Sequence, residues 1–203
     1  MVFEIHPENP QARFLSAIVK ELEKGGVGII PTDSVYSFCC LSDNLRGIEK
    51  IAKLTGKKFK QSNFSMMFMD LSQVSAYTKP FNNTVFRTLQ RNLPGPFTFI
   101  LKATNEVGRV FKNNRKTIGV RIPNNKIVLD LIALLGKPLV VASLHDEDEI
   151  IEYTNDPEMI VEKWENQVRF IVDGGIGNIS PSTVVDCSED EMEIIREGIQ
   201  ELQ

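Results

Sequence analysis

A group of oxygen-bearing side chains follows a short apolar run near the start of the chain. The apolar run, Val27–Ile30, is followed by Pro31 and then by three short hydroxyl or carboxyl side chains and a phenol: Thr32, Asp33, Ser34 and Tyr36. Because proline offers no N–H to a sheet ladder, the predicted strand ends at Pro31 or runs along a sheet edge. Small ligands bind at the carboxyl ends of strands in open α/β sheets, which makes this stretch a candidate binding site. The alternative is a capped turn, with Asp33 or Ser34 as the N-cap of the next helix.

Arg121 is a second candidate, because its guanidinium stands in an otherwise apolar stretch. The pattern of residues 116–123 predicts a strand that ends at proline, and alternation points Arg121 away from Val120 and Ile122. A guanidinium in this position binds a carboxylate or phosphate through paired hydrogen bonds, or it pairs with an internal acid. Few acids lie nearby in the sequence, which slightly favours a ligand.

Two more stretches place hydroxyl groups at the ends of predicted strands. Ser143 ends the apolar run 138–143, and Ser182 stands where another strand begins. Each stretch alone is more typical of a turn. Together with Thr32 and Arg121, they predict one polar pocket over a sheet.

A glycine-led basic loop supplies cations. Lys57, Lys58 and Lys60 follow Gly56, and lysines in a loop meet phosphates as point charges. Neither G-x-x-x-x-G-K-[ST] nor G-x-G-x-x-G occurs in the chain, so this is not a Walker loop. The loop by itself therefore does not define a nucleotide site.

The histidines and cysteines offer less chemistry. His6 and His145 do not have the spacing of metal ligands, so no resident metal is predicted. His145 adjoins an acidic run and is interpreted as a solvated loop residue rather than a general base. Cys39 and Cys40 lack a histidine partner nearby, which disfavours a cysteine nucleophile. Three methionines are interpreted as core residues: Met66, Met67 and Met69.

Length and composition indicate one globular domain. The 203 residues suffice for one sizeable core, and no repeat or linker divides them, so one domain is expected over residues 1–203. No apolar run is long enough to cross a bilayer, and the start of the chain lacks a signal peptide, so no membrane partner is expected. Three cysteines form neither a disulfide framework nor a metal site, which favours the reducing cytoplasm.

The net charge of −4 hides an uneven distribution. Residues 46–126 contain 16 lysines and arginines against 3 acids, a balance of +13, whereas residues 127–203 contain 4 against 18, a balance of −14. A basic centre indicates an anionic partner, either nucleotide phosphates or a nucleic-acid backbone. Lysines that only solubilise helices would give the same pattern, and the sequence favours neither interpretation.

Strands and helices alternate along the chain, with several neighbouring strands close enough for hairpins. Apolar residues spaced three and four apart predict helices at 11–24, 44–55, 71–77, 82–91, 107–113, 125–135 and 156–164. Apolar and β-branched runs predict strands at 1–9, 27–30, 64–69, 97–102, 116–123, 138–143, 168–172, 182–186 and 193–196. The expected fold is a single-domain α/β protein with an open mixed sheet.

Four motifs resemble the YrdC/YciO family and stand in the family's order. They are Pro-Thr-Asp-Ser-Val-Tyr at 31–36, Thr-Ile-Gly-Val-Arg-Ile-Pro at 117–123, Pro-Ser-Thr-Val-Val-Asp at 181–186 and Ile-Arg-Glu-Gly at 195–198. Residues 92–102 strengthen the resemblance, which covers nearly the whole chain. The stretch 143–145 and the lack of a C-terminal extension look more like the YciO branch. The resemblance implies a twisted, YrdC/RibB-like mixed sheet with a basic concave face.

The activity known in this family is synthesis of threonylcarbamoyl-AMP from threonine, bicarbonate and ATP, with release of pyrophosphate, for the modification of a tRNA adenosine. The resemblance implies that Thr32 and Arg121 hold the amino acid and that Ser143 and Ser182 complete its pocket. It implies nucleotide contacts from a further set: Lys57, Lys58, Ser62, Thr117, His145 and Arg196. ATP would enter with Mg²⁺ bridging its phosphates, and catalysis would rest on positioning and charge stabilisation.

Two departures from the family pattern weaken the implied activity. The synthases carry a Lys-x-Arg pair before a proline, whereas the matching stretch here, 55–58, is Thr-Gly-Lys-Lys. Lysine cannot reproduce the bidentate phosphate contacts of arginine. The synthases also carry Ser-x-Asn, whereas Leu144 and His145 follow Ser143 here, so an amide is missing at a nucleotide contact.

The leading hypothesis is a nucleotide-binding enzyme that makes or uses an acyl- or carbamoyl-adenylate, with threonylcarbamoyl-AMP synthesis as the specific candidate. The rival is a non-catalytic module that binds tRNA or double-stranded RNA through a basic surface. Its contacts would be four lysines: Lys53, Lys57, Lys58 and Lys60. A degenerate relative that only binds a nucleotide is a third alternative.

Overall fold

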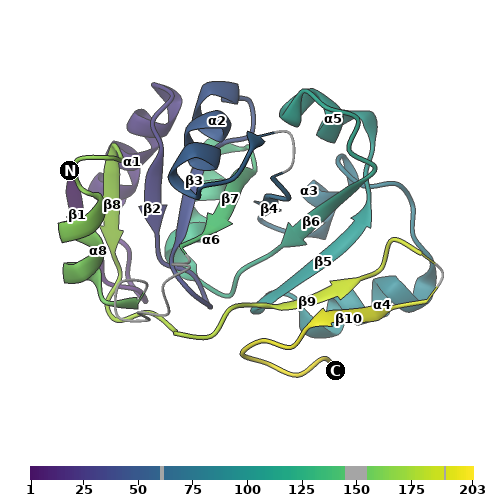
Figure 1. Ribbon diagram of the computed structural model, residues 1–203. Helices are drawn as coiled ribbons and strands as arrows, with labels where there is room; N and C mark the ends of the chain where they lie inside the picture. Colours follow the sequence, from purple (N-terminus) through teal and green to yellow (C-terminus); the bar gives the residue numbers. More distant parts are fainter. Residues whose placement is uncertain (60–61, 145–154, 190) are drawn as a thin grey trace.

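The strands of the chain pair into one continuous mixed sheet (Figure 1). A computed structural model describes residues 1–59, 62–144, 155–189 and 191–203. The sheet has ten strands in the order β1-β8-β2-β3-β7-β4-β6-β5-β9-β10. The strands are Val2–Glu4 (β1), Gly28–Ile30 (β2), Ser37–Leu41 (β3), Ser65–Met67 (β4), Phe97–Lys102 (β5), Thr117–Arg121 (β6), Leu139–Ser143 (β7), Phe170–Asp173 (β8), Thr183–Asp186 (β9) and Glu193–Arg196 (β10). Parallel pairs such as β4–β6 and antiparallel pairs such as β5–β6 confirm the predicted mixed sheet.

Most of the described helices begin at polar side-chain caps that the sequence supplies. They are Ala12–Glu23 (α1), Leu45–Leu54 (α2), Leu71–Ser75 (α3), Asn83–Asn92 (α4), Asn105–Phe111 (α5), Lys126–Leu135 (α6) and Pro157–Trp164 (α8). Asn44, Asn82 and Asn125 accept hydrogen bonds from N–H groups in the first turns of α2, α4 and α6. Helix α6 ends at Gly136, which has a φ of +62°. Glycine adopts this left-handed conformation readily because it has no β-carbon. The helices lie where the apolar spacing predicts them.

The segment after the polar motif differs from the sequence expectation. The alternative of a capped turn into a helix is wrong, because residues 37–41 form strand β3, which pairs with β2 and β7. All five residues of β3 are buried, so the strand has no polar and apolar alternation to reveal it. The motif is therefore the connection of a tight antiparallel pair.

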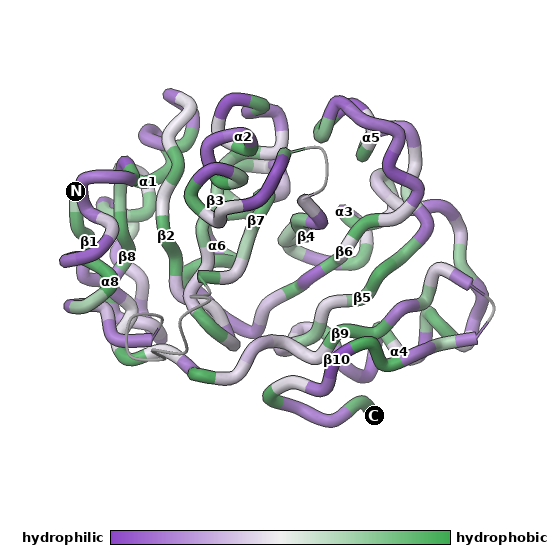
Figure 2. Tube along the Cα trace, viewed as in Figure 1, coloured by the Kyte–Doolittle hydropathy of each residue, from purple (hydrophilic) through white to green (hydrophobic). Residues whose placement is uncertain are grey.

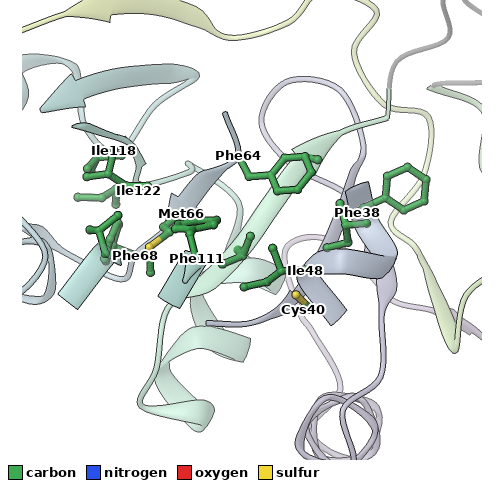
Figure 3. Close-up of a cluster of buried hydrophobic side chains, with 14 of the residues drawn as sticks. Phe38, Cys40, Ile48, Phe64, Met66, Phe68, Phe111, Ile118 and Ile122 are labelled. Carbon is green, nitrogen blue, oxygen red and sulfur yellow. The ribbon is translucent and has the colours of Figure 1, made fainter. Parts of the chain in front are cut away.

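One face of the sheet, the core face, is apolar from β8 to β9. The register Cys40–Val140–Met66–Val120–Phe99 runs over five neighbouring strands, and each of these side chains is buried. Helices α2, α4, α5 and α8 pack on this face, and Figure 3 shows part of the resulting cluster.

The opposite face is covered over only part of its width. Helices α1 and α6 pack against β8, β2, β3 and β7, where Cys39, Leu41 and Val141 contribute to a second apolar cluster. Farther along, the strand register places polar, small and a few apolar residues on this side of β4, β6, β5 and β9: Ser65, Thr117, Gly119, Arg121, Thr98, Ile100 and Val184. These residues belong to neither apolar cluster, and we call this part of the sheet the open face. In Figure 2 the tube is hydrophobic along the covered β2 and β3 and becomes hydrophilic at the carboxyl end of β6.

Candidate functional site

The turn after β2 is built by its own hydroxyl groups. The Thr32 hydroxyl donates to the Val35 carbonyl at 2.8 Å and accepts the Ser34 N–H at 3.0 Å. Thr32 and Ser34 are both buried. Pro31 ends the strand ladder, and a short hydroxyl side chain then satisfies the backbone of the turn that follows. The turn is therefore pre-formed and presents Asp33 toward β6.

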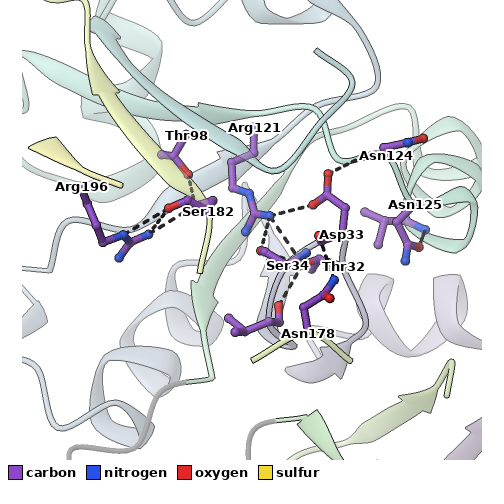
Figure 4. Close-up of polar contacts among 12 residues, drawn as sticks. Thr32, Asp33, Ser34, Thr98, Arg121, Asn124, Asn125, Asn178, Ser182 and Arg196 are labelled. Atoms are coloured by element: carbon purple, nitrogen blue, oxygen red, sulfur yellow. Dashed lines mark hydrogen bonds and ion pairs between the residues drawn. The ribbon is translucent and has the colours of Figure 1, made fainter. Parts of the chain in front are cut away.

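Arg121 joins this turn to the end of β6 (Figure 4). Its Nη2 donates to Asp33 Oδ1 at 3.0 Å, to Ser34 Oγ at 2.8 Å and to Thr32 Oγ1 at 3.5 Å. The side chains of Arg121 and Asp33 are 3% and 7% exposed. The second Asp33 oxygen accepts the backbone N–H of Asn124 at 2.7 Å. Burial lowers the pKa of Arg121, and the charge and hydrogen bond of Asp33 oppose that shift.

This pairing resolves the alternative that the sequence left open for Arg121. The guanidinium does pair with an internal acid, 88 residues away in the chain. The pairing uses only one nitrogen, since all hydrogen bonds of Arg121 to described residues come from Nη2. Nε is buried and has no hydrogen-bond partner. The rest of the guanidinium therefore remains able to bind an acceptor from a ligand.

Ser182 brings a second cluster next to Arg121. Phe99 pairs with Val120, so Thr98 lies beside Arg121 on the neighbouring strand, and its hydroxyl is 2.8 Å from that of Ser182. Arg196 donates from Nη2 to the Ser182 carbonyl at 2.8 Å, and burial lowers its pKa. Figure 4 shows Arg121 between this cluster and the Asp33 turn. Thr32 and Arg121 thus lie in one cluster, and Ser182 and Arg196 lie in the cluster beside it.

A glycine-rich segment that sequence reasoning missed closes the other side of the turn. The Tyr36 hydroxyl donates to the Gly175 carbonyl at 2.6 Å and accepts the Gly174 N–H at 3.1 Å. The Asn178 side chain donates to the Asp33 carbonyl at 3.2 Å. A β-carbon on Gly177 would lie 2.8 Å from the Tyr36 ring, so only glycine allows this approach. The run Asp-Gly-Gly-Ile-Gly-Asn at 173–178 was the available signal.

The remaining predicted residues lie at the edges of the site. Ser143 ends β7 and pairs with Ser37, whose buried hydroxyl has no hydrogen-bond partner. Thr117 begins β6 on the open face, half-buried. The Ser62 hydroxyl is buried and donates to the Lys58 carbonyl at 2.9 Å, so it stabilises the basic loop.

The predicted lysine surface is exposed where it is described. Lys53 on α2 and Lys57 and Lys58 after it all face solvent. Lys60 and His145 lie outside the described residues.

The burial of the cysteines and methionines tests the roles predicted for them. Cys39, Cys40 and Cys187 are free and buried, and burial raises the pKa of Cys39 to about 12 and of Cys187 to about 11. Thiols held protonated in this way are poor nucleophiles. Met66 and Met67 are core residues, as predicted. The same interpretation is wrong for Met69, which follows the end of β4 and is 42% exposed.

The fold and site together define an α/β protein with a buried guanidinium at the rim of an uncovered sheet face. The family profile described as Sua5_yciO_yrdC, telomere recombination, matches residues 20–198. The chain belongs to the Sua5/YciO/YrdC family. An uncharacterised protein of Haemophilus influenzae is 43% identical over 197 residues, covering 97% of this chain and 94% of that protein. The uncharacterised protein YciO of Escherichia coli K12 is 39% identical over 203 residues, covering 99% and 97%.

The chain is also similar, more distantly, to an enzyme of named activity. The threonylcarbamoyl-AMP synthase of Mus musculus is 29% identical over 193 residues, covering 91% of this chain and 66% of that protein. Among solved structures, that of E. coli YciO matches with a TM-score of 0.90, covering 99% of this chain and 97% of that one. Sua5 of P. abyssi in complex with L-threonine matches with a TM-score of 0.84 and 22% identity, covering 98% and 57%. These similarities confirm the predicted family, its YciO-like character and its fold.

Among the helices of the described ranges, none combines the length and the apolar character that crossing a bilayer requires.

Proposed function

We propose that the chain binds L-threonine or a related carboxylic acid beside Arg121 and ATP with Mg²⁺ along the open face, and that it synthesises threonylcarbamoyl-AMP. The amine of threonine and bicarbonate would condense to a carbamate with loss of water. The carbamate oxygen would then attack the α-phosphorus of ATP and expel pyrophosphate. The protein's part would be to position the reactants and stabilise charge.

One observation carries this proposal: the partly satisfied guanidinium of Arg121. Nη2 is fixed by Asp33 and Ser34, so the side chain is oriented before any ligand arrives. Nε is buried without an acceptor, and leaving such a donor unpaired costs about 1–3 kcal/mol. A carboxylate that supplies the acceptor recovers that free energy. The hydroxyl groups of Thr32 and Ser182 nearby add polar contacts for an amino acid.

The similarity to a named synthase and to a protein crystallised with L-threonine supports the same substrate class. Three free, buried cysteines accord with a reaction in a reducing compartment such as the cytoplasm.

Calorimetric titration of ATP and Mg²⁺, with and without threonine and bicarbonate, tests the proposal together with an assay of pyrophosphate release. We expect threonine-dependent pyrophosphate release that Arg121→Gln reduces at least tenfold. Arg109→Gln is the matched control, because Arg109 is exposed and, among the described residues, forms its ion pair with Glu106 on its own helix. Full activity in Arg121→Gln would contradict the role of Arg121. Nucleotide binding without turnover would indicate a different acid or a protein that only binds nucleotides.

A second candidate function, binding of tRNA or double-stranded RNA, is favoured by the exposed lysines at 53, 57 and 58 within the basic centre of the chain. Phosphate contacts release counterions, so the affinity for structured RNA should fall steeply as salt is raised. Changing these three lysines together to glutamine should reduce both the affinity and the slope with salt. A dissociation constant that is flat across salt concentrations would exclude this function.

A further inference from the structure

The open face offers a strip along which an extended ligand can lie. Along β6, alternation places Arg121, Gly119 and Thr117 on this face, over about 13 Å at roughly 3.3 Å per residue. At Gly119 the side chains of both neighbouring strands come close, because a β-carbon there would lie 2.4 Å from Ser65 Oγ and 3.2 Å from the Thr98 methyl group, so a larger side chain would not fit. Gly119 and Thr117 are half-buried, whereas Val120 and Ile118 on the core face are fully buried.

A lysine stands at the far end of this strip. Lys102 pairs in register with Thr117, and their neighbours Leu101 and Ile118 are buried on the core face, so Lys102 lies on the open face. Its ion pair with Glu189 is long, at 3.6 Å, and the two side chains are 50% and 82% exposed. An exposed pair of this kind contributes little and is easily displaced.

The other cations of the open face are already engaged. Arg121 is paired with Asp33, and Arg196 donates to the Ser182 carbonyl. The basic loop approaches the same end as Lys102, because it leads into β4, where Ser65 pairs with Gly119. Among the described residues, the carboxylates near Lys102 are Glu189 and Asp186, and Asp186 lies on the same face and accepts the Ser188 N–H.

We propose that Lys102 binds the phosphate chain of the nucleotide and supplies the cation that the missing Lys-x-Arg pair leaves absent. The inference rests on the proposed function, in which ATP occupies the open face. With the carboxylic acid at Arg121, the phosphates run over Gly119 and past Thr117 toward the Lys102 ammonium. Glu189 then competes with the phosphates for Lys102, so its removal strengthens binding.

Calorimetric titration of ATP and Mg²⁺ into three variants tests this assignment. Lys102→Met should weaken binding about fivefold to tenfold and reduce its dependence on salt, as expected for loss of one charge-assisted contact. Glu189→Gln should tighten binding. Lys116→Met is the matched control: Lys116 is exposed one residue before β6, where alternation places it on the other face, so binding should be unchanged.

Adenosine, which has no phosphates, separates a phosphate contact from a general disturbance of the site. Its affinity should be equal in the unaltered chain and in Lys102→Met. Equal weakening by Lys102→Met and Lys116→Met, or loss of adenosine affinity, would overturn the assignment. ATP binding that Lys102→Met leaves intact would overturn it while the proposed function stands. Absence of ATP binding in the unaltered chain would overturn both.

Discussion

The two halves of one side of the sheet differ in helix cover and in residue type. Over β8, β2, β3 and β7 this side is covered by α1 and α6 and carries apolar residues such as Phe170, Leu41 and Val141. Over β6, β5 and β9 no described residue on this side belongs to an apolar cluster, and the strands carry Thr117, Gly119 and the half-buried Ile100. The core face behind both halves is apolar throughout.

This contrast teaches that the site is created by the end of a helical layer rather than by a special loop. Beyond the strands that α1 and α6 cover, the same side of the sheet carries polar groups, among them Thr117, which is half-buried, and Arg121, which is buried. The buried ion pair of Arg121 and Asp33 and the glycine-rich segment lie at that boundary. Residues of the covered half should therefore govern stability, and residues of the open half should govern binding.

The largest effect should come from the covered half. Phe170→Ala removes a fully buried ring that packs over Gly28, and it should cost about 3–5 kcal/mol in free energy of unfolding. Ile100→Ala on the open face is the matched variant and should cost roughly 1 kcal/mol or less. Chemical denaturation measures both. Equal losses would show that the two halves do not differ in this way.

At the boundary, Arg121→Met should leave the buried carboxylate of Asp33 without its ion-pair partner. Removing one partner of a buried ion pair costs roughly 3 kcal/mol, because the other charge stays buried and unpaired. The double variant Arg121→Met with Asp33→Asn should recover part of that loss, which denaturation of both variants would reveal. If the second change adds further destabilisation instead, the pair is not the structural link described above.

A smaller effect is expected where the glycine-rich segment meets the polar turn. Tyr36→Phe removes the hydroxyl that bridges Gly174 and Gly175, at a cost of about 1–2 kcal/mol. Hydrogen exchange should accelerate at the Gly174 amide and stay unchanged at the Gly177 amide, which bonds to the Asn155 carbonyl instead. Unchanged exchange at Gly174 would contradict this role of Tyr36.

The smallest effect concerns pH and the outer edge of the covered half. Arg169 and Lys24 lower the pKa of Glu21 through hydrogen bonds, and so Glu21 joins α1 to the start of β8. Because the folded-state pKa is lowered, this contribution is present above the unfolded-state pKa and is lost as pH falls through the folded-state value. Glu21→Gln should therefore reduce stability at neutral pH and make no difference in strong acid. A deficit that persists in acid would place the effect in packing rather than in charge.

Local patterns predicted most elements of the fold and several residues of the site. Helix α6 was visible from Asn125 and Gly136 at its ends, and β5 was predicted with the bounds that it has. Strand β3 was missed, since a strand buried on both faces shows no alternation. The glycine-rich segment was missed because its role depends on Tyr36, which is distant in the chain.

The sequence by itself determined the approximate positions of the helices and of all strands but β3, and that polar groups gather at the ends of β2 and β6. Those features depend on residues that are close in the sequence, so local sequence patterns predict them. Only the tertiary structure decided that Arg121 meets Asp33 through one nitrogen, and that Lys102 shares a face with it. Both depend on the order and register of strands distant in the chain, and on where α1 and α6 leave the sheet uncovered.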